Sequence, residues 1–253
     1  MKIRISLFLA AALLAVGSCT KRPVRPDLGT TAIDTLISNN GLACKVEYRF
    51  ATIRNAAASP ALEAIEQANI GYFFLLEGFS GTPEEAAQAS LHEIAAEYLQ
   101  DIPEQSYTYE YSIDSEISVT DTLLTCVINR WSYLGGAHGM YGTECHTYSL
   151  ADGYEYELAD LFSEEEQQNL AAAIHAKLCE EYEAADDEAL SEAGFFPEYI
   201  AATENFILTP EGMTFHFNPY EIGCYALGSI EVSLTHEEIG QLRNGSRRPE
   251  RQK

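Results

Sequence analysis

The longest regular pattern in this 253-residue chain is an alternation of apolar and polar residues that begins at Tyr107. A period of two places alternate side chains on one face of an extended strand and predicts a half-buried strand. A turn at Thr120 and Asp121 separates it from a second apolar strand that ends at Trp131. We therefore predict a long antiparallel hairpin. Its first strand presents these residues on one side: Tyr109, Tyr111, Ile113, Ile117 and Val119.

Helix signals lie on both sides of this hairpin. Thr82 is followed by Pro83 and then Glu85, and Ser163 is followed by Glu166, so both positions carry the capping pattern that begins a helix. The second helix presents one apolar stripe: Leu170, Ile174, Leu178 and Tyr182. Apolar runs predict further strands at residues 44–53, 70–76, 144–150, 154–158, 206–208, 213–217 and 230–234.

The order of these elements does not follow the regular strand and helix alternation of a doubly wound sheet. We therefore predict an α+β fold with antiparallel sheets, two main helices packed on them, and two small subdomains in one compact unit. The subdomains are assigned to residues 43–131 and 132–240. Residues 241–253 are rich in arginine and are expected to form a basic disordered tail.

The N-terminal segment has the order of a secretory signal peptide. Lys2 and Arg4 precede an uncharged run over residues 5–16, shorter than the about 20 residues that a membrane-spanning helix needs. Residues 14–19 resemble a bacterial lipobox, in which cleavage leaves Cys19 to be acylated. We expect a lipoprotein signal peptide at residues 1–18, then a lipidated Cys19 and a tether at residues 19–42. The alternative is a secreted protein with a cysteine at its cleavage site by chance.

Negative charge dominates the body of the chain. Residues 26–240 hold 38 of the 39 acidic residues but only five basic ones, which gives a formal charge near −33. A field of this sign repels nucleic acid and anionic membrane surfaces, and it speeds encounter with cationic partners. Solubility on a crowded membrane is an equally simple explanation of the charge.

The cysteines argue against two common kinds of site. If Cys19 carries lipid, five cysteines remain, and an odd number leaves at least one thiol unpaired. No two of them have C-x-x-C spacing, so zinc-ribbon and thioredoxin chemistry are unsupported. Cys126 and Cys145 lie on strands expected to pair, and a disulfide between them depends on the register.

Four segments of the second half resemble a bacterial envelope domain, the domain of unknown function 3298 family. They are Tyr-Leu-Gly-Gly-Ala-His-Gly at residues 133–139, Leu-Ala-Asp-Leu-Phe at 158–162, Phe-Asn-Pro-Tyr-Glu-Ile at 217–222 and Tyr-Ala-Leu-Gly at 225–228. The resemblance spans residues 130–240, and the first half is similar to the small domain that usually precedes this one. The motif residues are Tyr133, Gly135, Gly136, His138, Gly139, Tyr220, Tyr225 and Gly228.

This family occurs in the extracellular part of lysozyme-sensing anti-sigma factors, beside some peptidoglycan deacetylases, and in many lipoproteins. The chain has no sigma-binding segment and no room for a deacetylase domain, so neither activity carries over. Cys224 also departs from the family pattern, which has alanine or proline there. The resemblance implies binding or sensing at the envelope.

His138 is the one candidate for catalysis. Glycines around a histidine allow close approach of a ligand, and His146 with Glu144 suggests a two-histidine, one-carboxylate metal site or a general base. The spacing fits no helical zinc motif, however. We favour a structural interpretation, in which Gly135, Gly136 and Gly139 have positive φ and the imidazole bonds to the backbone. We assign no catalytic residue and no metal ligand.

The main functional hypothesis is a non-enzymatic binding or sensing lipoprotein, without a cofactor, at the bacterial envelope. Its acidic domain would engage a cationic protein such as lysozyme, or cell-wall glycan, but not nucleic acid. One alternative is a hydrolase of peptidoglycan or another polymer that uses His138. Another is a structural accessory lipoprotein. Thr20, Lys21 and Arg22 lack the acidic run of some surface-exported lipoproteins, which favours a position facing the periplasm.

Overall fold

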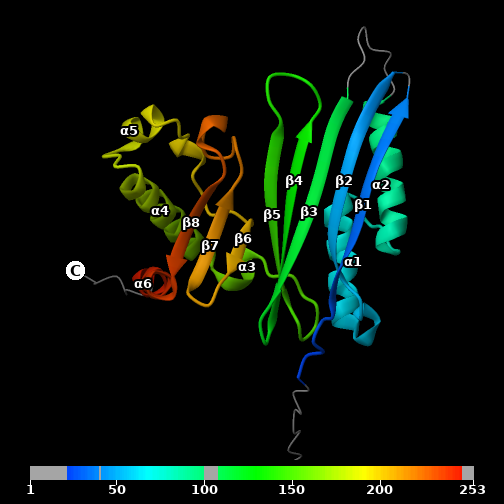
Figure 1. The fold of residues 1–253 in the computed structure, drawn as a ribbon. Helices are drawn as coiled ribbons and strands as arrows, with labels where there is room; N and C mark the ends of the chain where they lie inside the picture. The colour runs from blue at the N-terminus through cyan, green and yellow to red at the C-terminus, as the bar shows by residue number, and fades with distance from the viewer. Residues whose placement is uncertain (1–21, 40, 100–107, 247–253) are drawn as a thin grey trace, which may run out of the picture.

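The computed structural model describes residues 22–39, 41–99 and 108–246 of the chain. The mixed α+β fold is confirmed: the strands form two separate sheets, one of five strands and one of three. Figure 1 shows the smaller sheet and its helices beside the edge of the larger sheet. The predicted signal peptide and Cys19 lie outside the described residues. Within the described part, no helix is long and apolar enough to span a bilayer.

The larger sheet has the strand order β1-β2-β3-β4-β5. Its strands are β1 (Leu28–Asn39), β2 (Leu42–Ile53), β3 (Thr108–Val119), β4 (Leu123–Tyr133) and β5 (Met140–Ser149). The predicted hairpin is β3 and β4, paired with Ser115 opposite Ile128. All neighbours are antiparallel except β2 and β3, because two helices carry the chain across the sheet between them. The prediction of antiparallel sheets was therefore wrong at this pair.

The two crossover helices are α1 (Pro60–Phe74) and α2 (Pro83–Tyr98), and they cover one face of the larger sheet (Figure 1). The predicted capping box of Thr82 and Glu85 is present at the start of α2. Residues 70–76, expected to form a strand, are instead the end of α1 and the turn after it. The count of two main helices was therefore too low, because α1 has 15 residues and α2 has 16.

The core between this sheet and its helices is rich in aromatic rings. Tyr48 and Phe50 of β2 meet Phe73 and Phe74 of α1, with Tyr48 edge-on to both phenylalanine rings. The Tyr48 hydroxyl is satisfied by Ser90 of α2 at 2.8 Å. These contacts fix both helices against the same strand.

The second layer follows β5. It contains α3 (Leu158–Leu161), α4 (Glu164–Glu181), α5 (Asp187–Glu192), β6 (Phe206–Leu208), β7 (Gly212–Phe217), β8 (Ile230–Thr235) and α6 (His236–Ser246). The described residues also form three short 3-10 helices: one before α1, at Ala56–Ala58, and two in the second layer, at Pro197–Tyr199 and Tyr225–Leu227. The capping box at Ser163 opens α4 as predicted, and Leu170, Ile174 and Leu178 are buried against the small sheet. Tyr182, expected on the same stripe, follows the helix and is exposed.

Three predicted boundaries need correction. Residues 28–39, assigned to a tether, form β1, which pairs with β2 along its whole length. β5, assigned to the second subdomain, completes the larger sheet. Residues 241–246, assigned to a disordered tail, belong to α6. The predicted strand at residues 154–158 is reduced to one bridge, between Tyr148 and Glu155.

Two asparagines join the layers at the free edge of β5. The Cys145 N–H donates to Asn205 Oδ1 at 2.9 Å, and the Thr143 N–H donates to Asn218 Oδ1 at 2.7 Å. Both amide Nδ2 atoms donate to the Thr143 carbonyl, at 2.8 and 3.0 Å. An exposed strand edge offers unpaired backbone groups to other chains, and here side chains of the second layer occupy them.

Candidate functional site

The glycine-rich segment at residues 133–139, which resembles the family motif, connects β4 to β5. Gly135 and Gly136 have φ of 89° and 98°, as predicted. Gly139 was expected to share this conformation, but it does not. It is confined instead by close approach, because a Cβ there would lie 3.0 Å from the Ser132 carbonyl oxygen. Tyr133 closes the turn by donating to the Gly136 carbonyl at 3.1 Å.

His138 joins the two motif segments. Its Nδ1 lies 2.8 Å from the Gly139 carbonyl oxygen, so this nitrogen donates, and its ring stacks on Tyr225 at 4.0 Å. The Tyr225 hydroxyl donates to the same carbonyl at 2.8 Å. The predicted bond between the imidazole and the backbone is therefore confirmed.

Nothing in the geometry assembles a metal centre around His138. No group of three or more histidine, cysteine, aspartate or glutamate residues in the described ranges could hold a metal ion. Among the ion pairs of the described residues none includes His138, so no carboxylate orients its ring.

The remaining motif residues shape the same junction. Tyr220 has φ of 74° and is half exposed, with its ring 5.7 Å from that of Tyr225. Gly228 has φ of 77°, and a Cβ there would lie 3.3 Å from the Tyr141 hydroxyl. The motif therefore holds the second layer against the end of the larger sheet.

The proposed disulfide between Cys126 and Cys145 is wrong, since both cysteines are free. Cys126 pairs with His146, and Cys145 pairs with Val127. A difference of one residue in register turns the two thiols to opposite faces of the sheet. Burial raises the pKa of both thiols to about 12.

His146, one face of which is covered by α1, is the centre of a second cluster. Its ring stacks on Tyr72 of α1 at 4.0 Å, with only 9° between the planes. Its Nδ1 lies 2.7 Å from Glu155 Oε1, and the Tyr72 hydroxyl donates to Glu155 Oε2 at 2.9 Å. Its Nε2 is 3.8 Å from Glu144 Oε2, which is too long for a hydrogen bond.

The electrostatics favour a protonated His146. Burial opposes the charged imidazole, but the hydrogen bond to Glu155 and the negative charges of Glu144 and Glu155 outweigh it, so the pKa of His146 is raised. Burial likewise opposes the charge on Glu144, yet His146 and Arg130 lower the pKa of this carboxyl. Arg130 donates to Glu144 at 3.1 Å and to the Tyr72 carbonyl at 2.6 Å.

This cluster forms one wall of a cleft of about 640 Å³ along the free edge of β5. The second layer supplies the opposite wall, including Asn205, Phe206 and Asn218. Of the described residues that line the cleft, His146 is the only one that can carry positive charge. Five glutamates line it: Glu144, Glu155, Glu157, Glu204 and Glu221.

An apolar groove of about 540 Å³ adjoins this acidic cleft and shares Tyr72 and Glu144 with it. It follows the end of α1 and includes Leu75, Leu76 and Phe79. Leu75 is 57% exposed and has φ of 57°, an unusual conformation for a branched residue. An exposed apolar surface beside dense charge is typical of a protein interface.

Sequence reasoning found only part of this site. Glu144 and His146 were considered only as possible partners of His138 in a metal site or as a general base. Tyr72, Glu155 and the two asparagines were missed, and only the Asn-Pro-Tyr segment of the family motif pointed to one of them, Asn218.

Comparison with known proteins gives a family and a fold. Residues 159–237 match the family described as "Protein of unknown function (DUF3298)". A crystal structure of a DUF3298 family member from Bacteroides fragilis is 23% identical in sequence, with a TM-score of 0.75 over 88% of this chain and 100% of its own. A second, from Pseudomonas aeruginosa, is 14% identical, with a TM-score of 0.60 over 87% of this chain and 95% of its own. No curated protein matches the chain.

Proposed function

We propose that this protein, which carries a DUF3298 family domain, is a non-enzymatic binding lipoprotein of the bacterial envelope. The acidic cleft binds a cationic protein, such as lysozyme, and Cys19 holds the domain beside the membrane. The observation that carries the proposal is the gathering of five glutamates around one histidine where the two layers meet. Such a surface steers a cationic partner and raises its rate of association.

The adjoining groove supports a protein as the ligand rather than a small cation. A metal ion or a small amine would use the carboxylates alone, whereas a protein can also bury apolar side chains against Leu75 and Phe79. Interfaces of this kind combine an apolar centre with a charged rim.

The test is binding of hen lysozyme to the purified protein at low and moderate salt. The Glu157→Gln/Glu221→Gln variant removes two charges from the cleft and keeps oxygen acceptors at both positions. The matched control, Glu181→Gln/Glu188→Gln, removes two charges from the exposed ends of α4 and α5. We expect the cleft variant to weaken binding about 10-fold and the control variant less than about 2-fold.

Absence of binding by the unaltered protein at both salt concentrations would contradict the proposal, and so would equal effects of the two charge variants. Leu75→Ala tests the groove separately. Because Leu75 is exposed, this change should lower affinity several-fold without lowering stability.

The lipid anchor is tested by labelling cells with a radioactive fatty acid. We expect label on the unaltered protein and none on Cys19→Ala. An unlabelled protein, in cells that label other lipoproteins, would remove the anchor but leave the cleft proposal standing.

A further inference from the structure

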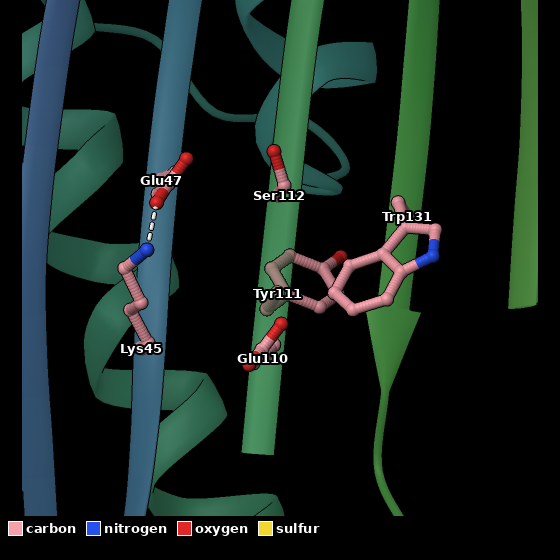
Figure 2. Close-up of a pocket in the computed structure, with 6 residues that line it drawn as sticks. All are labelled: Lys45, Glu47, Glu110, Tyr111, Ser112 and Trp131. Atoms are coloured by element: carbon pink, nitrogen blue, oxygen red, sulfur yellow. Dashed lines mark ion pairs between the residues drawn. The ribbon is translucent and has the colours of Figure 1, made fainter. Parts of the chain in front are cut away.

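Trp131, the single tryptophan of the chain, lies on the face of the larger sheet that α1 and α2 leave uncovered (Figure 2). It is 38% exposed. Figure 2 shows its indole ring reaching from β4 toward β3, above the sheet. Register places it in one row across the strands, with Ser112 and Glu47 on one side and Tyr141 on the other. The row therefore presents a flat aromatic ring between polar groups.

The neighbouring row adds both signs of charge. Lys45 of β2 pairs in register with Glu110 of β3, and Lys45 also forms an ion pair with Glu47 (Figure 2). Donors and acceptors thus stand together beside the indole: an ammonium, two carboxylates and the Ser112 hydroxyl.

The indole separates two shallow hollows. The one in Figure 2 has a volume of about 250 Å³ and is lined by Lys45, Glu110 and Ser112 among others. The second, about 270 Å³, is lined by Met140, Tyr141 and Asn218 among others. Trp131 lines both, so a ligand longer than one ring can contact the indole from either side.

We propose that this surface is a binding site for a neutral oligosaccharide, with one pyranose ring stacked on Trp131. A pyranose has an apolar face of C–H groups and an edge of hydroxyls that both donate and accept hydrogen bonds. The indole matches the face, while Lys45, Glu110 and Ser112 match the edge. Lys45 opposes a cationic ligand, and the two carboxylates oppose an anionic one, so a neutral polyol fits this site best.

A chain of aromatic contacts extends this surface toward the family motif. Tyr141 lies 5.7 Å from Tyr225, which stacks on His138. A Cβ at Gly139 would lie 3.0 Å from the indole Nε1, so the glycine-rich segment between β4 and β5 fits closely against Trp131. The indole is therefore held in place before a ligand arrives, which reduces the entropy lost on binding.

The experiment uses the fluorescence of the purified protein, because Trp131 is its only tryptophan. The probes are N-acetylchitotetraose and cellotetraose, with pentalysine as a cationic comparison. We expect at least one saccharide to shift and quench the emission with a dissociation constant on the order of 1 mM. Calorimetry should show at least about a 10-fold loss of affinity for Trp131→Ala and a smaller loss for Glu110→Gln. Tyr154→Ala, at a tyrosine that is 50% exposed elsewhere, is the matched control.

The proposal is overturned if neither saccharide changes the emission up to about 20 mM, or if pentalysine alone changes it. It is also overturned if Trp131→Ala binds saccharide as well as Tyr154→Ala does. The groups that would contact the saccharide, Trp131, Lys45, Glu110 and Ser112, do not line the acidic cleft, so either outcome leaves the lysozyme-binding result unaffected.

Discussion

Removing the Asn205 amide should show how strongly the two layers are joined. Asn205→Ala deletes the acceptor of the Cys145 N–H and one donor to the Thr143 carbonyl. A hydrogen bond contributes about 1 kcal/mol net, and an unpaired buried N–H costs about 1–3 kcal/mol more. Since these groups are only partly buried and water can reach them, we expect a loss of about 2 kcal/mol in the free energy of unfolding.

Asn218→Ala should cost a similar amount, because its amide holds both backbone groups of Thr143. The two losses should not simply add. Each single variant leaves the Thr143 carbonyl with one amide donor, whereas the double variant removes both. We expect the double variant to exceed the sum of the single variants by about 0.5–1 kcal/mol.

The assay is urea unfolding followed by circular dichroism, with Gln241→Ala on the exposed face of α6 as the control. The control should change stability by less than about 0.5 kcal/mol. Single variants within about 0.5 kcal/mol of the unaltered protein would refute the view that these amides join the layers. If the losses of the two single variants add exactly, the inference that both amides stabilise the same Thr143 carbonyl would be refuted.

The remaining predictions concern His146, two glycines and the free cysteines. Because the pKa of His146 is raised, its contribution to stability is complete below its ordinary pKa of 6.5 and is lost as pH rises through the raised value. The unfolding free energy should therefore fall with pH above that point, and His146→Gln should flatten this dependence. Gly153→Ala places a Cβ 2.7 Å from the Ala61 carbonyl oxygen at φ of 80°, so it should cost at least about 2 kcal/mol in urea unfolding. Gly41→Ala has similar φ, 86°, but open space, and should cost only about 1 kcal/mol. Thiol labelling of the native protein at pH 8 should modify Cys179 and Cys224 but leave the buried Cys44, Cys126 and Cys145 unmodified until urea is added.

Local signals predicted the elements whose patterns are uninterrupted. The β3 and β4 hairpin, the capping boxes of α2 and α4, and β8 all follow from period and cap residues. α1 was missed although Ser59 and Pro60 give it the cap and first residue of a helix. Its buried face includes Glu66 and Asn69, and these polar residues interrupt the apolar stripe that would have marked a helix. The apolar run at residues 70–76, at the end of this helix, therefore resembled a strand.

The side-chain oxygens of these two buried polar residues accept hydrogen bonds from partners across the core. Glu66 accepts from the Ile53 N–H at 2.8 Å and from the Thr52 hydroxyl, and Asn69 accepts from the Tyr148 hydroxyl at 2.9 Å. No local pattern contains these partners. β1 was missed for a different reason: it is an edge strand in which no residue is fully buried, so its composition resembles that of a loop.

The candidate site was less predictable than the fold, since its contacts join residues far apart in the chain. Tyr72 meets Glu155 across 83 positions, and Asn218 meets Thr143 across 75. The predicted disulfide between Cys126 and Cys145 was wrong only because the register of the β4 and β5 pair could not be predicted. The length and conformation of the connection at residues 134–139 decide whether Cys126 faces Cys145 or His146, and a single residue changes the answer.

The negative charge of the acidic cleft acts against the contact between the two layers. Its glutamates come from both sides, with Glu144 on β5 and Glu204 and Glu221 in the second layer, so their mutual repulsion opposes the contact that forms the cleft. Arg130 and His146 offset this repulsion on one wall only. At the cleft, the layers are joined by the neutral amides of Asn205 and Asn218, which bond to the backbone without adding charge. A cationic ligand between the walls would neutralise the remaining repulsion between the glutamates. The charge that weakens the contact between the layers in the empty cleft therefore favours the cleft with a cationic ligand bound.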